Sequence, residues 1–187
     1  RRRSALYLTS RPTPYRYYRL KITSISGTAG YVKIADVQFE WDGTWQTNAM
    51  TDDSSGTIGA YSATIAASGN YSGSSSYKAY RAFDSSTSNT WVGAKSKFET
   101  SGDKDHKTDF SWLSVDFGVG NEVTITGMQL KGYAGSGNDG SPDDYILQYS
   151  SDGSNWYDIA ASQVTGADTK NTYHTNNFGT DGGSTPD

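Results

Sequence analysis

The chain has 187 residues, enough for one domain with a hydrophobic core and flanking tails. Only 34% of the residues are hydrophobic, yet 13% are aromatic, and glycine occurs 21 times. Aromatic residues suit half-buried strands and glycine suits the turns between them, so the composition favours an all-β protein. Because there is no cysteine, disulfides, thiol nucleophiles and zinc–thiolate sites are excluded. No apolar run approaches the length of a transmembrane helix, about 20 residues.

The net charge of −4 is unevenly distributed. Seven of the 16 basic residues and none of the acidic residues lie within residues 1–21. Residues 1–14 also contain two prolines and no hydrophobic period, which predicts an extended basic arm. Because the rest of the chain is acidic, nucleic acid is not the expected partner. We expect the arm to contact a neighbouring subunit in an oligomeric assembly, or else to be solvated.

Residues 15–178 predict one domain of short strands. Hydrophobic and polar residues alternate from Tyr18 to Ile22, the pattern of a half-buried strand. A second strand is expected over residues 32–41, with a β-bulge near Ala35, where the alternation slips. Further strands are expected over residues 62–67, 112–117, 123–130, 145–150, 156–159 and 172–178.

The connections between these strands are rich in turn residues. Residues 44–61 are expected to form a loop, residues 77–83 a helical turn, and residues 179–187 a flexible tail. A series of short strands separated by turn signals favours a β-sandwich or a barrel.

Four groups of motifs share the order found in one known family. They are AAS, AxxAFD and TxxTW over residues 66–91, WLSVDFG over residues 112–118, ITG over residues 125–127, and YILQYSSDGSNW over residues 145–156. Together they resemble the discoidin (coagulation-factor type C) domain, which has a galactose-binding-like fold. The resemblance implies an antiparallel β-sandwich of the jelly-roll type that binds ligands through loops at one end.

One departure from the family pattern concerns the order of the strands. Discoidin domains usually end with a strand containing RYxRL and then a strand containing ExEL. Similar motifs lie here near the start of the chain, at residues 16–20 and 34–39, which resembles a circular permutation. A sandwich tolerates permutation because its termini often lie close together. Permuted modules of this kind are similar to those of bacteriophage virion proteins, so an extracellular or virion-surface location is expected.

Catalysis is not expected. The chain has only two histidines, His106 and His174, and neither belongs to a recognisable triad pattern. Glutamate occurs three times, so the carboxylate pair of a glycosidase would have to depend on aspartate. We therefore expect a binding or structural protein rather than an enzyme.

The resemblance implies one structural Ca²⁺ ion. The matching ligands are Asp84, Thr87 and Asn89 in one loop, with Asp36 in place of the usual glutamate. Calcium takes six to eight oxygen ligands, so a tight loop with one remote carboxylate suits it. In the alternative interpretation, Asp84 caps a turn and Asp36 bonds backbone amides.

The resemblance also implies a ligand site in the loops 69–77 and 132–144, flanked by residues 93–111. The candidate ligand-binding residues are Tyr71, Tyr77, Lys95, His106, Tyr133, Asn138 and Asp139. Aromatic rings pack on the C–H face of a sugar while polar groups bind its hydroxyls, so the expected partner is a glycan or cell-surface polysaccharide. Alternatively, these residues lie in solvated loops or fill a subunit interface. Membrane insertion is not expected, because the loop tips are Gly, Ser and Tyr.

Two functions remain open from the sequence. The first is a non-catalytic carbohydrate-binding or adhesion module. The second is a structural or decoration subunit of a virion or surface assembly, in which the sandwich is a scaffold and the arm mediates subunit contacts. In both cases we expect Phe83, Trp91, Trp112 and Trp156 to belong to the hydrophobic core.

Overall fold

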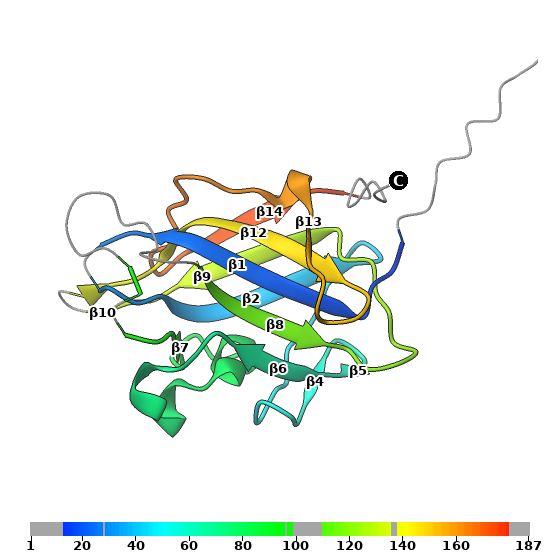
Figure 1. Ribbon diagram of the computed structural model, residues 1–187, viewed down its shortest axis with the longest axis horizontal. Helices are drawn as coiled ribbons and strands as arrows, with labels where there is room; N and C mark the ends of the chain where they lie inside the picture. The colour runs from blue at the N-terminus through cyan, green and yellow to red at the C-terminus, as the bar shows by residue number, and fades with distance from the viewer. Residues whose placement is uncertain (1–12, 28, 96, 99–109, 136–137, 180–187) are drawn as a thin grey trace, which may run out of the picture.

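The computed structural model describes residues 13–27, 29–95, 97–98, 110–135 and 138–179, and the chain forms an antiparallel β-sandwich (Figure 1). Most of the predicted arm and tail lies outside the described residues. One sheet has the strand order β13-β12-β1-β8-β6, and the second has the order β14-β9-β2-β3 with β7 also paired to β2. The predicted all-β sandwich is thereby confirmed.

The strands of the first sheet are β1 (Tyr17–Ile25), β6 (Thr64–Ala67), β8 (Ser111–Asp116), β12 (Pro142–Ser150) and β13 (Tyr157–Asp158). The second sheet contains β2 (Lys33–Trp41), β3 (Thr44–Trp45), β7 (Trp91–Val92), β9 (Gly127–Gly132) and β14 (Tyr173–Asn177). Two small hairpins are made by β4 (Thr57–Ile58) with β5 (Tyr61–Ser62), and by β10 (Ala134–Gly135) with β11 (Asn138–Asp139). Short 3-10 helices are η1 (Tyr71–Gly73), η2 (Ser75–Tyr77), η3 (Ala79–Phe83) and η4 (Ala160–Ser162).

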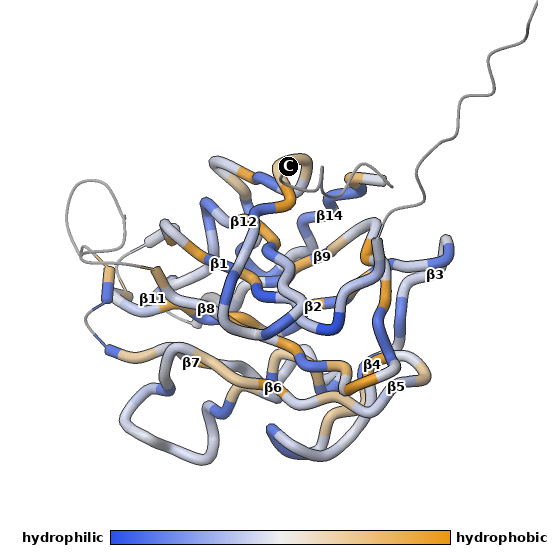
Figure 2. Tube along the Cα trace, turned by 45° about the vertical axis from the view of Figure 1, so that its right-hand side comes forward, coloured by the Kyte–Doolittle hydropathy of each residue, from blue (hydrophilic) through white to orange (hydrophobic). Residues whose placement is uncertain are grey.

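Strand β1 is the centre of the first sheet. Tyr18, Leu20 and Ile22 are buried, while the residues between them lie on the outer face. Leu20 is paired with Leu147 of β12 on one side and Leu113 of β8 on the other, which places three leucines in one row of the core. The alternation of hydrophobic and hydrophilic residues along the strands can be followed in Figure 2. The period-2 pattern of the sequence therefore correctly predicts which face of β1 is buried.

Strand β2 is the centre of the second sheet and contains the predicted bulge. Ile34 pairs with Gly132 and Asp36 with Lys131, so Ala35 is the extra residue. After the bulge, Val37, Phe39 and Trp41 enter the core. The shift in register turns Asp36 away from the hydrophobic interior, because neighbouring residues of a strand point to opposite faces.

Other expectations differ from the structure in detail. Residues 44–61 are not a plain loop, since they contain the short strands β3 and β4 and bury Met50 and Ile58. The predicted strand 123–130 begins only at Gly127, because Val123 pairs in an isolated bridge with Tyr15 instead. The helical turn expected over residues 77–83 is η3.

The prediction of four aromatic core residues is half correct. Phe83 and Trp91 are buried, but Trp112 and Trp156 lie outside the core. Trp112 alternates with the buried Leu113 and therefore points to the outer face of β8. The guanidinium of Arg19 lies 4.3 Å from the ring centre of Trp156 and 6.0 Å from that of Trp112. These two rings therefore pack against the guanidinium of Arg19 and not against the hydrophobic core.

Candidate functional site

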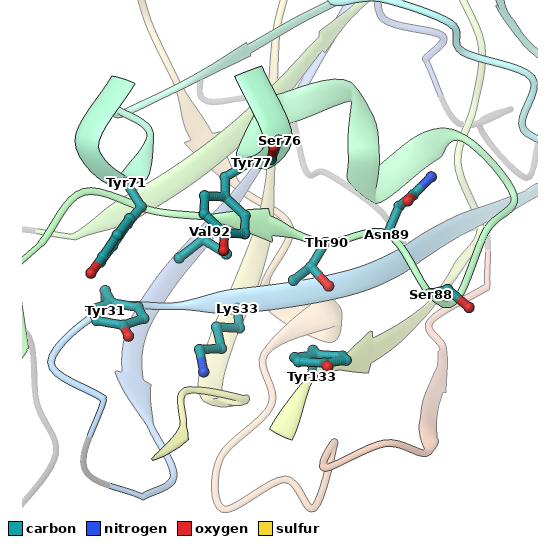
Figure 3. A pocket seen from close by; sticks show the side chains of 10 residues that line it. All are labelled: Tyr31, Lys33, Tyr71, Ser76, Tyr77, Ser88, Asn89, Thr90, Val92 and Tyr133. Carbon is teal, nitrogen blue, oxygen red and sulfur yellow. The ribbon is translucent and has the colours of Figure 1, made fainter. Parts of the chain in front are cut away.

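A pocket of about 290 Å³ opens at the end of the sandwich where β2 begins (Figure 3). Segments that are far apart in the sequence form it: the start of β2, the short helices η1 and η2, the strand β7 with the turn before it, and the residue that links β9 to β10. Its lining residues are Tyr31, Lys33, Tyr71, Ser76, Tyr77, Ser88, Asn89, Thr90, Val92 and Tyr133. The lining therefore combines aromatic rings, hydroxyl groups, one amide and one ammonium group.

Lys33 is the first residue of β2 and lies between two tyrosines in Figure 3. Its Nζ is 5.5 Å from the ring centre of Tyr31 and 6.0 Å from that of Tyr133. Only 8% of the residue is exposed, and burial lowers the pKa of Lys33, while the charge of Asp139 acts in the opposite direction. The backbone of Lys33 is fixed by bonds to Gly140 and Tyr133, with N···O distances of 2.8 and 3.2 Å.

Tyr71 and Tyr77 form an aromatic wall with Tyr31. The ring centres of Tyr71 and Tyr31 are 4.9 Å apart, and those of Tyr71 and Tyr77 are 5.7 Å apart, both in edge-on geometry. Nζ of Lys95 lies 4.3 Å from the ring centre of Tyr71. The indole Nε1 of Trp91 donates to Asn70 Oδ1 at 3.0 Å and so anchors the segment that carries Tyr71.

Asn89 belongs to the opposite edge of the pocket, in the turn before β7. Its Nδ2 donates to Oδ2 of Asp84 at 2.6 Å, and the backbone N–H of Ser86 donates to Oδ1 of the same carboxylate at 2.9 Å. Asp84 therefore caps this turn, in which Ser85 has a positive φ of 60°. The cap fixes the edge of the pocket formed by residues 88–90.

Four of the seven predicted ligand-binding residues lie at this pocket. Tyr71, Tyr77 and Tyr133 line the pocket, and Lys95 lies against Tyr71. Asp139 does not line it, because its carboxylate accepts from the N–H of Ser141 at 2.9 Å and lies 3.7 Å from Nζ of Lys170.

Asn138 is in β11, opposite Gly135, and its side chain lies outside the described residues, as does His106. The other histidine, His174, is 2.8 Å from the hydroxyl of Tyr145, a residue of the core, and is not part of the pocket.

The sequence reasoning missed six lining residues: Tyr31, Lys33, Ser76, Ser88, Thr90 and Val92. One signal was available for Lys33, which is a charged residue between the hydrophobic residues Val32 and Ile34. Asn89 was predicted as a metal ligand, but it lines the pocket through the edge that Asp84 caps.

The predicted calcium ligands Asp36 and Asp84 have different hydrogen-bond donors, and Ser85, next to Asp84, donates to the backbone carbonyl of Asn48. Oδ2 of Asp36 accepts from Tyr173 at 2.6 Å and from Gln38 at 3.0 Å, and Oδ1 accepts from Asn48 at 3.3 Å. Burial raises the pKa of Asp36, and the negative charge of Asp84 adds to this effect. Thr87 is exposed to solvent.

The side-chain oxygen of Asn48 is a further candidate ligand for the predicted Ca²⁺ ion. It is buried beside Asp36 and has no hydrogen-bond partner. Within the described part of the chain, no group of three or more His, Cys, Asp or Glu is placed to hold a metal ion. The carboxylates of Asp36 and Asp84 and the side-chain oxygen of Asn48 would supply oxygen ligands of the kind that Ca²⁺ prefers. Asn89, in contrast, directs its amide nitrogen at Asp84.

Comparison with known proteins gives one family match. The F5/8 type C domain matches residues 64–182. No curated protein and no solved structure matches the chain. The matched segment excludes β1 and β2, although these strands occupy central positions in the two sheets. The permuted order and the similarity to bacteriophage modules stay predictions.

Proposed function

Because this chain belongs to the F5/8 type C (discoidin) domain family, we propose that it is a carbohydrate-binding module whose pocket holds the sugar. Domains of this family commonly act in carbohydrate or phospholipid binding or in adhesion. The observation that carries the proposal is the lining: four tyrosines surround a small cavity whose edges carry Ser, Thr and Asn side chains. Such a lining offers ring faces to the C–H surface of a sugar and hydrogen-bonding groups to its hydroxyls.

The proposed role is binding without catalysis. Modules of this family are typically non-catalytic. The described lining of the pocket holds neither a carboxylate nor a histidine, whereas glycoside hydrolysis needs a pair of carboxyl groups on either side of the bond. The cavity volume of about 290 Å³ is at the lower end of the range for small-molecule sites, about 300–1,000 Å³. The pocket therefore suits a short portion of a glycan.

A glycan array followed by calorimetry tests this function. Tyr133 is 37% exposed and lines the pocket, whereas Tyr157 is 44% exposed and lies on β13. Saturable binding that Tyr133→Ala abolishes and Tyr157→Ala retains would support the pocket as the site. No binding to any glycan, or equal binding by both variants, would contradict it.

The proposed place of action is an extracellular or virion surface, where the module would attach its owner to a cell-surface polysaccharide. Domains of this family are generally extracellular or surface modules. No helix in the described part of the chain is long and apolar enough to span a membrane.

A second candidate function is subunit assembly through the basic arm. A hollow of about 440 Å³ at the opposite end of β2 is lined by Thr13, Pro14, Trp41, Asp42, Tyr61, Glu122, Val123 and Thr124. Two carboxylates and two aromatic rings in one hollow suit a Lys or Arg side chain, and the sequence has four arginines within residues 1–12. The arm of a neighbouring copy would supply them.

Light scattering on the full chain tests the assembly role. Removal of residues 1–12, or the double substitution Asp42→Asn with Glu122→Gln, should reduce the measured mass to that of a monomer. A full chain that is monomeric at high concentration would contradict this role.

We also propose that Ca²⁺ binds near Asp36 and Asp84. The ion would take their carboxylates and the unpartnered side-chain oxygen of Asn48 as ligands. Added Ca²⁺ should then raise the melting temperature, and Asp84→Asn should remove the rise. A melting temperature that is the same in Ca²⁺ and in excess EDTA would contradict the site.

A further inference from the structure

The sugar pocket continues onto the outer face of the second sheet. Residues two apart in a strand lie on the same face, about 6.6 Å from each other. Tyr133, which lines the pocket, directly follows β9, and its N–H donates to the carbonyl of Lys33 at 3.2 Å, so the pairing with β2 reaches the pocket. Lys131, Gln129 and Gly127 follow at this spacing along β9, whereas the two residues between them belong to the hydrophobic core. This face of β9 therefore runs from the pocket for roughly 20 Å.

The neighbouring strands widen this face. Paired residues of adjacent strands carry their side chains side by side, so each of the three β9 residues has one neighbour on β2 and one on β14. The three resulting rows, which we call the outer rows, are Asp36–Lys131–Tyr173, Gln38–Gln129–Thr175 and Glu40–Gly127–Asn177. Strand β3 adds Trp45, which pairs with Glu40. Four strands thus contribute to one surface that begins at the pocket.

The row nearest the pocket carries an aromatic ring. Tyr173 is 38% exposed, and its hydroxyl bonds Asp36 two strands away at 2.6 Å, so the side chain lies across β9. Nζ of Lys131 is 5.7 Å from the centre of the ring. The ring therefore has a fixed position beside the pocket, where its exposed surface can pack against the C–H face of a sugar.

The middle row carries two amides held in a chain of hydrogen bonds. Nε2 of Gln129 donates to Oε1 of Gln38, whose own Nε2 donates to Oδ2 of Asp36 at 3.0 Å. The hydroxyl of Thr175 donates to Oε1 of Gln129 at 3.4 Å. An amide nitrogen carries two hydrogens, and the bonds among the described residues use one hydrogen of each amide. The second hydrogen of each can donate to a sugar hydroxyl.

The last row carries acceptor oxygens. A Cβ added to Gly127 would lie 2.6 Å from Oε2 of Glu40 and 2.8 Å from Oδ1 of Asn177, so both oxygens converge over its backbone. Carboxylate and amide oxygens accept hydrogen bonds from hydroxyl groups. Trp45, which is partly exposed, adds a second aromatic ring beside Glu40. This end of the face therefore offers both acceptors and a ring to a sugar unit.

We infer that the ligand is an extended, uncharged oligosaccharide, with one unit in the pocket and the following units on the outer rows. This inference rests on the proposed carbohydrate-binding function and deepens it, since a chain of sugars takes the place of a single one. The surface is continuous with the pocket, and rings, donors and acceptors follow one another along it. Lys131 and Glu40 contribute opposite charges at its two ends, so uncharged sugar units suit it.

Calorimetry on the full chain with ligands of increasing length tests the inference. The probes are galactose, glucose and mannose, each with its β-1,4-linked disaccharide and tetrasaccharide. In at least one series we expect the tetrasaccharide to bind about tenfold more tightly than the monosaccharide, because one or two additional hydrogen bonds give about that factor. A ligand held by the pocket alone would gain no affinity with length.

Variants identify the groups responsible. Gln129→Ala removes the central amide of the outer rows and should abolish most of the gain with length, while monosaccharide binding stays unchanged. Asn177→Ala changes an exposed residue, so it preserves the fold, and it should reduce the gain. Gln163→Ala is the matched control, because Gln163 is an exposed glutamine that follows η4 and donates to the carbonyl of Val164. It should bind every length as the unmodified protein does.

The outcomes separate the inference from the function on which it rests. Equal binding of all lengths, lost in Tyr133→Ala, would overturn the extended ligand but keep the sugar pocket. Binding to none of these sugars would overturn both. A gain with length that survives both Gln129→Ala and Asn177→Ala would overturn the outer rows as the path of the chain.

Discussion

The hydroxyl of Tyr173 donates a 2.6 Å hydrogen bond to Oδ2 of Asp36. The bond connects the edge strand β14 to the central strand β2 across β9, whose residue Lys131 is paired with both Asp36 and Tyr173. Asp36 is buried, so its carboxylate depends on donors from the protein. The bond therefore fastens the last strand of the sandwich to the middle of the second sheet.

Tyr173→Phe should remove this donor and destabilise the fold. A hydrogen bond to a charged group contributes about 1.5–3 kcal/mol, so we expect a loss of that order in the free energy of unfolding. Urea denaturation in excess EDTA measures the loss without a contribution from bound metal. Tyr157→Phe on β13 is the matched control and should change stability by less than about 0.5 kcal/mol. Equal midpoints for both variants would show that the bond contributes nothing.

The ion pair of Arg16 with Asp116 predicts a pH effect on stability. The Nε and Nη2 atoms of Arg16 donate to the two oxygens of Asp116 at 2.6 and 2.7 Å. Burial raises the pKa of Asp116, but the hydrogen bonds from Arg16 and from the N–H of Gly118 outweigh it, so the pKa lies below its usual value. A lowered pKa stabilises the fold above the unfolded-state pKa, about 3.9, and this contribution disappears as the pH falls through the folded-state pKa.

Asp116→Asn should therefore cost stability at pH 7 and cost much less near pH 2. The measurement is urea denaturation of both proteins at several pH values. A difference between the two proteins that is constant with pH, or that grows as the pH falls, would contradict the prediction.

The stacking of Arg19 on Trp156 and Trp112 predicts that lysine cannot replace it. Besides the rings, the Nε of Arg19 donates to Gln148 at 2.8 Å. The planar guanidinium makes both contacts at once, whereas an ammonium group cannot stack. Arg19→Lys should lower the free energy of unfolding by about 0.5–2 kcal/mol and shift the tryptophan fluorescence to the red. An unchanged emission spectrum would mean that the guanidinium does not shield these rings.

The part of the fold that the sequence predicts is the part encoded locally. The alternation around Tyr18 and the slip at Ala35 set the two central strands and the bulge, because side-chain direction in a strand follows the sequence with a period of two. Trp112 obeys the same rule. It alternates with the buried Leu113, so the prediction that Trp112 belongs to the core is wrong.

The site was harder to predict because it depends on which strand ends meet. Tyr71 and Tyr133 come from loops that the family resemblance identifies. Lys33 begins β2 and Tyr31 lies two residues before it, and both reach the pocket only because β2 pairs with β7 and β9. The bond between Asp36 and Tyr173 joins residues 137 positions apart. Such contacts follow from strand order and register, which no local pattern of the sequence specifies.

Gly140 predicts how the pocket depends on its backbone. The carbonyl of Gly140 accepts the N–H of Lys33 at 2.8 Å, and a Cβ at Gly140 would collide with the backbone oxygen of Tyr31. Gly140→Ala should therefore displace Tyr31 and Lys33 together, lower the free energy of unfolding by about 1–3 kcal/mol, and weaken sugar binding. Gly135→Ala is the matched control, because among the described residues its Cβ would meet Tyr133 Cε1 alone, at an ordinary 3.6 Å. Calorimetry and thermal denaturation of both variants separate the effects; binding retained by Gly140→Ala would mean that the sugar does not depend on the position of Tyr31 and Lys33.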